Sequence, residues 1–468
     1  MPRLFAACCL ALLAAAPARA QAPEPIRLTL RPMAPSSPAL RYRLLPELIG
    51  QTPGNAADLY KKAVPLLKLS ADDYKQLDEW EKLPLDQLPC ADVRRLLAGY
   101  KEALGLIDQG ARREHCDWGL TERLRKSGVN ALLPEVQPMR ESARLLSMRA
   151  RVEIAEGQFD RAVRTLRTGL ALAKHVGESE TLISCLVGNA IAHVMAGQID
   201  LLVQQPKAPN LYWPLTDLPR PFLDLRKPFQ GERVMAYGTF PGVAEVLADR
   251  NAGPLGPEKV AQFSKMFFAL EERSPLRTRA ALALRLKKKH EAAKRALVAA
   301  GRPRELVEKM PHVQVALLHS FVEYERMYEE VLKWQTFSYA EAAPHLRAAL
   351  ERQKAELKDA EDRPVFDLAT PLMPALQKVF AARTRLDRKF AALRCVEAVR
   401  LYAAAHGGKL PPALGDVKEV PVPNDPMTGK PFEYKVTGDG KATLVGPPPD
   451  DLKKITAYVL KYELTLKW

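Results

Sequence analysis

The chain has 468 residues, of which 47% are hydrophobic and 27% charged, with a formal net charge of +15. This composition is typical of a folded globular protein and excludes an intrinsically disordered chain. The 39 prolines exclude one long uninterrupted coiled coil, and the aromatic share of 7% argues against a β-rich or aromatic-platform protein.

The first twenty residues have the pattern of a secretory signal peptide. Residues 4–16 form an unbroken apolar run, and Ala18 and Ala20 are small residues at the positions that a signal peptidase reads. The run is shorter than the roughly 20 residues that a membrane-spanning helix needs. We therefore expect export to the periplasm or the exterior, cleavage near Ala20, and no transmembrane segment in the mature form. An uncleaved membrane anchor is the alternative.

Cleavage would remove Arg3 and Arg19, which leaves 68 basic and 55 acidic residues and a net charge of +13. Four cysteines would remain, too few for a disulfide framework in a chain of this length. Cys90 and Cys116 flank one helical segment and could form a disulfide if the chain doubles back there. Two separate buried thiols are the alternative.

Residues 21–53 contain seven prolines and predict an extended leader, because proline interrupts a helix. Residues 54–375 predict a helical body, in which Asn55 is the first expected N-cap and apolar residues recur at helical spacing. The clearest helices are expected at 141–155 and 159–176. A proline-rich stretch at about 206–233 interrupts the pattern and predicts a long, packed crossing loop.

The tetrapeptide at 157–160 recurs in related form at 197–200. In each copy we expect the glycine to end one helix and the next apolar residue to begin the buried face of another. Small and apolar residues around the first copy resemble a tetratricopeptide-type repeat: Ala150, Gly157, Phe159, Ala162, Leu166 and Gly169. The resemblance implies stacked helical hairpins, and generic packing of two helices explains the same residues.

Residues 376–468 predict a different, C-terminal module. A long helix over about 376–405 is followed by a proline-rich loop, and the segments 432–436 and 442–445 flank Gly438-Asp439-Gly440, which predicts a β-hairpin. Residues 455–468 are rich in β-branched and aromatic residues and predict a final strand. The predicted fold class is therefore mainly α, with helical hairpins and a small C-terminal α+β module of about three antiparallel strands.

The order of helix, loop and sheet, together with the sequences at 401–411 and 424–434, resembles the periplasmic part of type II secretion major pseudopilins. A pseudopilin has its apolar helix at the N-terminus, so the resemblance implies a shape and not a pilus subunit. The matching loop binds calcium in some pseudopilins, but Asp425 and Asp439 offer few oxygen ligands and better suit turn capping.

The chain as a whole resembles an uncharacterised group of secreted planctomycete-type proteins, through the segments 40–46, 112–118 and 216–221. That resemblance implies export and architecture only, because the group brings no activity with it.

Familiar catalytic motifs are missing from the sequence: it contains no G-x-S-x-G, phosphate-binding loop, H-E-x-x-H or C-x-x-C. The sequence thus favours a protein that is not an enzyme, and it predicts no cofactor. Residues 114–117 place Glu, His, Cys and Asp in a row, but adjacent helical residues point in different directions, so a structural helix end is favoured over a nucleophile.

Two further patterns suggest ligand sites. His312, His319 and Glu323 share one helical face and could bind a divalent metal, although a polar stripe is the simpler interpretation. Between residues 273 and 304 there are eleven Lys or Arg and one acidic residue. A basic face formed by Arg277, Arg285, Lys288 and Arg295 could bind an anionic polymer or lipid head groups, and a solvated face without a partner is the alternative.

The sequence thus favours an exported, non-catalytic interaction or scaffold protein with a protein or envelope component as its partner. An envelope hydrolase without a recognisable motif is one alternative. Binding of an anionic polymer or a membrane surface through the basic helix is another, and no nucleic acid is expected for an exported protein.

Overall fold

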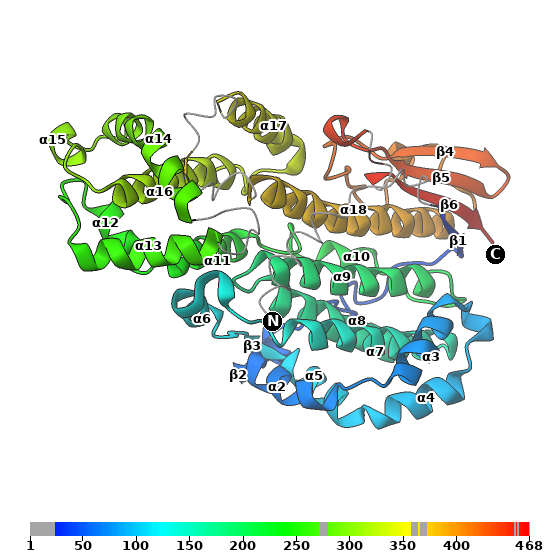
Figure 1. The fold of residues 1–468 in the computed structure, drawn as a ribbon. Coiled ribbons are helices and arrows are strands. Elements are labelled where there is room, and N and C mark those ends of the chain that lie inside the picture. Colours follow the sequence, from blue (N-terminus) through cyan, green and yellow to red (C-terminus); the bar gives the residue numbers. More distant parts are fainter. Residues whose placement is uncertain are drawn as a thin grey trace.

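The structure is a computed structural model that describes residues 24–271, 279–356, 364–365, 372–453, 455 and 458–467. Over these residues the protein is mainly helical with a small sheet near the C-terminus, which confirms the predicted fold class. Helices α7, α8, α9 and α18 lie in successive layers, and the sheet covers the side of α18 that faces away from α9 (Figure 1). The proposed signal peptide lies outside the described residues.

The first part of the body is built from short helices. Strands β2 (Thr52–Asn55) and β3 (Arg113–His115) pair in parallel. The helices are α2 (Ala56–Ala63), α3 (Ala71–Lys82), α4 (Cys90–Gly99), α5 (Lys101–Gly110) and α6 (Leu120–Ser127). Asn55 caps α2 as predicted, since its side chain accepts a hydrogen bond of 3.1 Å from the backbone N–H of Ala57.

Three long helices form the centre of the body: α7 (Val136–Ala155), α8 (Phe159–Gly177) and α9 (Leu182–Leu202). Gly157 has φ +69° and ends α7 as predicted, because this conformation is unfavourable for residues with a side chain. The second copy of the tetrapeptide does not form a turn: Gly197 lies inside α9. The expectation of a second hairpin turn there is wrong, because the surrounding apolar residues continue one helix.

Helices α8 and α9 approach closely where two glycines face each other. A Cβ atom added to Gly188 would lie 2.4 Å from the Cα of Gly177 and 2.5 Å from the carbonyl oxygen of Ala173. By length and composition α9 could cross a membrane, but 56% of its most apolar window is buried. In the structure α9 packs between α8 and α18.

The stretch predicted as a crossing loop, at about 206–233, holds α10 (Tyr212–Thr216) and the start of α11 (Arg226–Thr239), so the loop ends earlier than predicted. The next helices are α12 (Val243–Ala248), α13 (Pro257–Glu271), α14 (Arg279–Ala299), α15 (Arg304–Val307), α16 (His312–Leu332) and α17 (Tyr339–Glu356). Helices α12, α13 and α14 contact α16. Residues of α12, α14, α15 and α16 share a small core of their own, which includes Val246, Leu297 and Leu318.

The C-terminal module consists of α18 (Leu372–Ala405) and a sheet with strand order β1-β6-β5-β4. Strands β4 (Glu433–Gly438), β5 (Lys441–Gly446) and β6 (Leu460–Leu466) are antiparallel, as predicted. The fourth strand, β1 (Ile26–Leu30), comes from the leader and pairs in parallel with β6. The leader therefore completes the sheet of the C-terminal module, a contact that the sequence did not suggest.

Buried charges on α18 hold these distant segments together. Arg400 and Glu397 are fully buried and form an ion pair of 2.8 Å. The same guanidinium donates to the carbonyl oxygens of Arg31 in the leader and Ala208 in the crossing loop, at 3.1 and 2.9 Å. The Glu397 carboxylate also accepts a hydrogen bond of 3.0 Å from the backbone N–H of Leu211. These contacts fix the leader and the crossing loop against α18.

Candidate functional site

A cavity of about 320 Å³ opens between α5, α7, α8 and the leader. Five arginines, two carboxylates, two threonines, an alanine and a proline line it: Arg112, Arg149, Arg161, Arg164, Arg167, Asp108, Glu153, Thr165, Thr168, Ala111 and Pro46. We call it the arginine cavity. Its ionisable side chains carry a net charge of +3.

The arginines reach the cavity because α8 is amphipathic. On one side of this helix Ala162 and Leu166 are fully buried against the core. Arg161, Arg164 and Arg167 follow one another at intervals of three residues, which keeps them near one face of an α-helix. The fold then brings Arg112, which follows α5, to the same cavity.

The inner part of the cavity is a closed polar network. Arg149 donates two hydrogen bonds, of 2.7 and 2.8 Å, to the carboxylate of Asp108, which also accepts one of 2.9 Å from the hydroxyl of Thr168. Arg149 further donates to Thr165 at 3.0 Å, and the Thr165 hydroxyl donates to Glu153 at 2.6 Å. Burial raises the pKa of the Glu153 carboxyl, against the opposing effect of the Thr165 hydrogen bond and of Arg149.

The outer part of the cavity carries three arginines that no carboxylate contacts directly in the described part of the chain. Among the described residues, no side-chain hydrogen bond or ion pair is made by Arg112, Arg164 or Arg167. Arg112 and Arg164 are exposed and Arg167 is half-buried. Partial burial, and then the charges of Arg164 and Arg112, lower the pKa of the Arg167 guanidinium, against a smaller opposing effect of the Glu47 carboxylate in the leader. An anion placed among the three arginines would relieve this repulsion.

The arrangement suits recognition of phosphate or carboxylate groups. A guanidinium presents its N–H donors as a rigid fork that matches either anion, and such charge-assisted hydrogen bonds are stronger than neutral ones. The volume lies at the lower end of the range of about 300–1,000 Å³ found for small-molecule sites. An anionic head group would fit here, whereas a metal cation would be repelled by the arginines.

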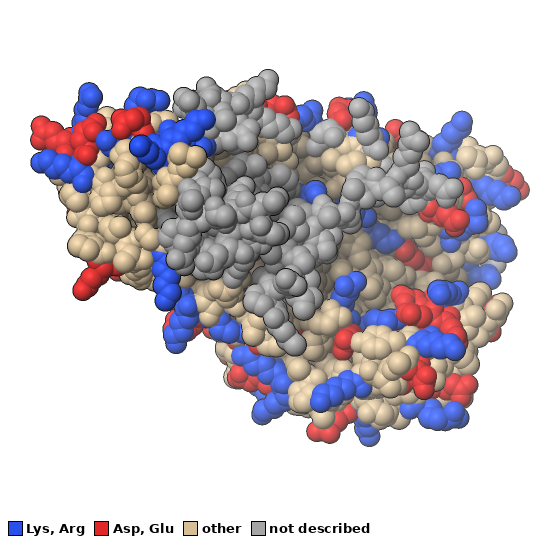
Figure 2. All heavy atoms as spheres, viewed as in Figure 1, with Lys and Arg blue, Asp and Glu red and all other residues tan. Residues whose placement is uncertain are grey.

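The structure places the predicted basic helix at another part of the molecule. Lys288 and Arg295 lie on α14 with exposed side chains, while Lys294 forms ion pairs with Glu291 and Glu308 at 3.3 and 2.7 Å. Basic and acidic side chains alternate at the end of the molecule formed by α14 and α15 (Figure 2). Arg277 and the side chain of Arg285 lie outside the described part of the chain, so the four-residue basic face stays a prediction.

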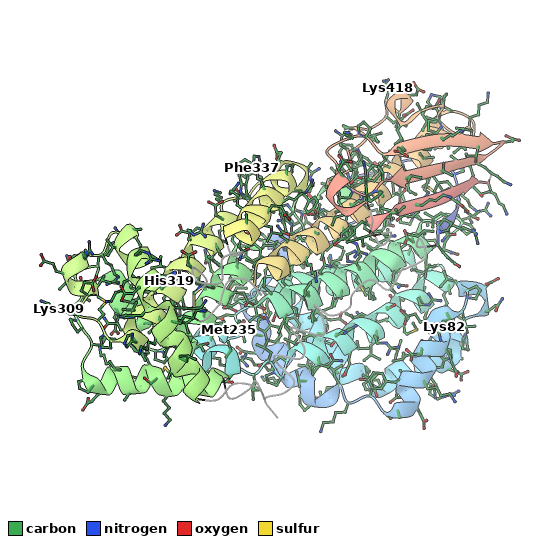
Figure 3. All side chains as sticks on the ribbon, turned by 45° about the horizontal axis from the view of Figure 1, so that its top comes forward. Lys82, Met235, Lys309, His319, Phe337 and Lys418 are labelled. Atoms are coloured by element: carbon green, nitrogen blue, oxygen red, sulfur yellow. The ribbon has the colours of Figure 1, made fainter. Side chains whose placement is uncertain are left out.

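The predicted metal site is wrong. His312 and His319 are two helical turns apart on α16, a rise of about 10 Å, and both cannot reach one ion at bond lengths of about 2 Å. His319 is 4% exposed and lies in the group of helices that packs around α16 (Figure 3). Glu323 pairs with Arg326 at 2.9 Å. Across the described residues, no group of three or more His, Cys, Asp or Glu could hold a metal ion.

The predicted disulfide is also wrong, because both thiols are free. Cys90 begins α4, which packs on α7, whereas Cys116 directly follows β3. These two elements lie well apart in Figure 1. The chain therefore does not double back in the way that a disulfide would require.

The cluster at 114–117 has a structural role. Burial raises the pKa of the Cys116 thiol to about 12, which disfavours the reactive thiolate. The adjacent Trp118 is buried, stacks on Tyr60 with ring centroids 5.7 Å apart, and donates a hydrogen bond of 2.8 Å to the carbonyl oxygen of His175. The segment thus anchors β3 to α2 and α8.

Asp425, the predicted turn-capping aspartate of the C-terminal module, is fully buried. It accepts a hydrogen bond of 2.9 Å from the Met427 backbone, as a turn cap does, and forms an ion pair with Arg388 of α18. Asp439 is exposed in the β4–β5 hairpin. The Arg388 guanidinium supplies the positive charge that a calcium ion would have brought to Asp425.

The arginine cavity itself did not emerge from the sequence. Three arginines at intervals of three residues on one helix were a visible signal, but Arg112 and Arg149 reach the same cavity from two other helical segments. None of the protein-family models, curated proteins or solved structures that were compared with the chain matches it. The cavity therefore has to be interpreted from its own chemistry.

Proposed function

We propose that this chain is an exported, non-catalytic helical binding protein whose arginine cavity holds an anionic phosphate or carboxylate group of its partner. The observation that carries the proposal is the convergence of Arg112, Arg164 and Arg167 on one cavity without carboxylate partners in the described chain. Export rests on the pattern of the first twenty residues.

The inner network supports binding more than catalysis. A general base or nucleophile must face the ligand with a lone pair to use. The carboxylate of Asp108 is already engaged by Arg149 and Thr168, and that of Glu153 by Thr165. Arginine stays protonated in proteins and serves here as a hydrogen-bond donor. The hydrolase alternative has no comparable geometry to support it.

Stabilisation by inorganic phosphate tests the proposal. A ligand that binds only the folded state raises the free energy of unfolding by about 2.7 kcal/mol at a hundredfold excess over its Kd. We expect this increase for the parent protein in phosphate, relative to chloride of equal ionic strength, and its loss in the double variant Arg164→Gln, Arg167→Gln. Phosphate stabilisation that persists in this variant would refute the proposal.

A matched control removes the same charge elsewhere. The double variant Lys288→Gln, Arg295→Gln takes two exposed positive charges from α14 and leaves the arginine cavity unchanged. It should keep the phosphate stabilisation. Heparin retention of both variants compares the cavity with the basic helix: loss of retention only in the α14 variant would favour the anionic-polymer alternative at that helix.

A further inference from the structure

The two most exposed large hydrophobic side chains among the described residues are neighbours at one tip. Leu48 is 87% and Ile49 is 95% exposed, in the short 3-10 turn Leu48–Gly50 of the leader. Single exposed apolar residues are common on protein surfaces. Two adjacent ones that are almost fully exposed form a small apolar projection. We call Leu48 and Ile49 the apolar tip.

This apolar tip is attached to the rim of the arginine cavity on both sides. Pro46, two residues before Leu48, lines the cavity. On the other side, the backbone N–H of Thr52 donates a hydrogen bond of 2.8 Å to the carbonyl oxygen of Arg112. Consecutive Cα atoms are about 3.8 Å apart, so the Cα atom of Leu48 lies within about 8 Å and that of Ile49 within about 11 Å of the Cα atom of Pro46.

The carboxylate at the base of the tip is paired with an arginine. Glu47 forms an ion pair of 2.8 Å with Arg43, which also binds Asp217 at 2.8 Å. Three arginines outnumber this one carboxylate, so the rim combines the apolar tip with an excess of positive charge. An anionic membrane has complementary chemistry: its hydrocarbon layer matches the apolar tip, and the phosphates just outside that layer match the arginines.

We infer that the tip of Leu48 and Ile49 enters an anionic membrane surface while the arginine cavity binds the phosphate of a phospholipid head group in the same leaflet. This inference rests on the proposed function, since it names the source of the anion that the cavity holds. Apolar insertion and electrostatic attraction add up in such binding. Neither the tip nor the arginines should suffice alone.

Cosedimentation with vesicles tests the inference. The purified protein should bind vesicles of phosphatidylcholine with phosphatidylglycerol and should not bind vesicles of phosphatidylcholine alone. In the double variant Leu48→Ser, Ile49→Ser, vesicle binding should weaken about a hundredfold, because each buried aliphatic side chain contributes roughly a factor of ten or more. The control variant Leu132→Ser changes another exposed leucine and should bind as the parent does.

Phosphate stabilisation separates failure of this inference from failure of the proposed function. The serine variant should keep the stabilisation by inorganic phosphate, while Arg164→Gln, Arg167→Gln should lose both phosphate stabilisation and vesicle binding. If the parent responds to phosphate but binds no anionic vesicles, the inference is wrong and the cavity binds a soluble anion. Unchanged vesicle binding by the serine variant would equally overturn the role of the tip. If the parent shows neither phosphate stabilisation nor binding to anionic vesicles, both proposals are wrong.

Discussion

Helices α8 and α18 both carry several arginines but use them in opposite ways. On α18, Arg388 and Arg400 are at most 2% exposed, and each forms an ion pair with a buried carboxylate. On α8, Arg164 is exposed and Arg167 is half-buried, and neither makes an ion pair within the described residues. The difference lies in the surroundings: the loop with Asp425 and Glu397 of α18 itself supply carboxylates to these two arginines, whereas α8 borders a cavity.

The comparison separates structural charge from charge available to a ligand. Arg388 also donates hydrogen bonds to the carbonyl oxygens of Pro447 and Tyr458, so its donors are used inside the protein. The corresponding donors of Arg164 and Arg167 face a cavity of about 320 Å³. Removing an arginine should therefore damage the fold at α18 and damage ligand binding at α8.

The largest expected effect is at Arg400. Arg400→Met should lower the free energy of unfolding by about 3–5 kcal/mol, because it leaves the fully buried carboxylate of Glu397 without its charge partner. Urea denaturation measures the loss. Adding Glu397→Leu should recover part of it, since replacing both members of a buried pair costs less than removing one. If Arg400→Met is as stable as the parent, Arg400 does not stabilise the fold and the contrast between α18 and α8 is wrong.

Glu232 of α11 is a buried carboxyl group that has no cationic partner in the described chain. It therefore contrasts with Glu397 and Asp425, which are paired with arginines of α18. Burial raises its pKa to about 7 from 4.5, against one hydrogen bond of 2.9 Å from the backbone N–H of Leu182. The folded protein therefore holds this proton more tightly than the unfolded chain, and stability should fall as pH rises from about 4.5 to 7.

Glu232→Gln should remove this pH dependence. At pH 8 we expect the variant to be more stable than the parent by roughly 3 kcal/mol, because each pKa unit corresponds to about 1.4 kcal/mol. At pH 4 the two proteins should be nearly equal. Urea denaturation at both pH values measures the difference in unfolding free energy between variant and parent. If this difference is the same at pH 8 and at pH 4, the raised pKa of Glu232 is wrong.

A third prediction compares the two faces of α8. Ala162 is fully buried on the face opposite the arginines. Ala162→Trp should overpack the contact with neighbouring helices and lower stability by about 1–3 kcal/mol. A thermal melt measures the loss, and an unchanged melting temperature would show that the buried face of α8 is misassigned.

The sequence predicted those parts of the fold that depend on local patterns. Amphipathic spacing indicated α8, Asn55 was identified as a cap, and Gly157 as a helix end, because each signal lies within a few residues. The pairing of β1 with β6 joins Ile26–Leu30 to residues more than 400 positions away, and no local pattern specifies that contact.

The same limit applies to the two kinds of arginine. Arg164 and Arg400 are each followed by apolar residues at helical spacing, so neither periodicity nor composition distinguishes them. Their roles depend on whether a carboxylate lies within hydrogen-bond distance once the chain has folded. For Arg400 this carboxylate is Glu397 in the previous turn of α18. The acidic residues near the α8 arginines are instead engaged by Arg43, Arg149, Arg161 or threonine hydroxyls.

The smallest expected change in stability is a slight gain. Arg164→Gln, Arg167→Gln removes like charges that are three residues apart on one helix, and such pairs destabilise a helix by about 0.2–0.5 kcal/mol. Without phosphate, the variant should therefore be as stable as the parent or slightly more stable at low salt. The difference should vanish at high salt, because exposed charges are screened over about 3 Å at 1 M. Urea denaturation at both salt concentrations, with Lys288→Gln, Arg295→Gln as the control for charge, measures this effect. A loss above about 1 kcal/mol would instead place these arginines with Arg400, as charges that hold the fold together.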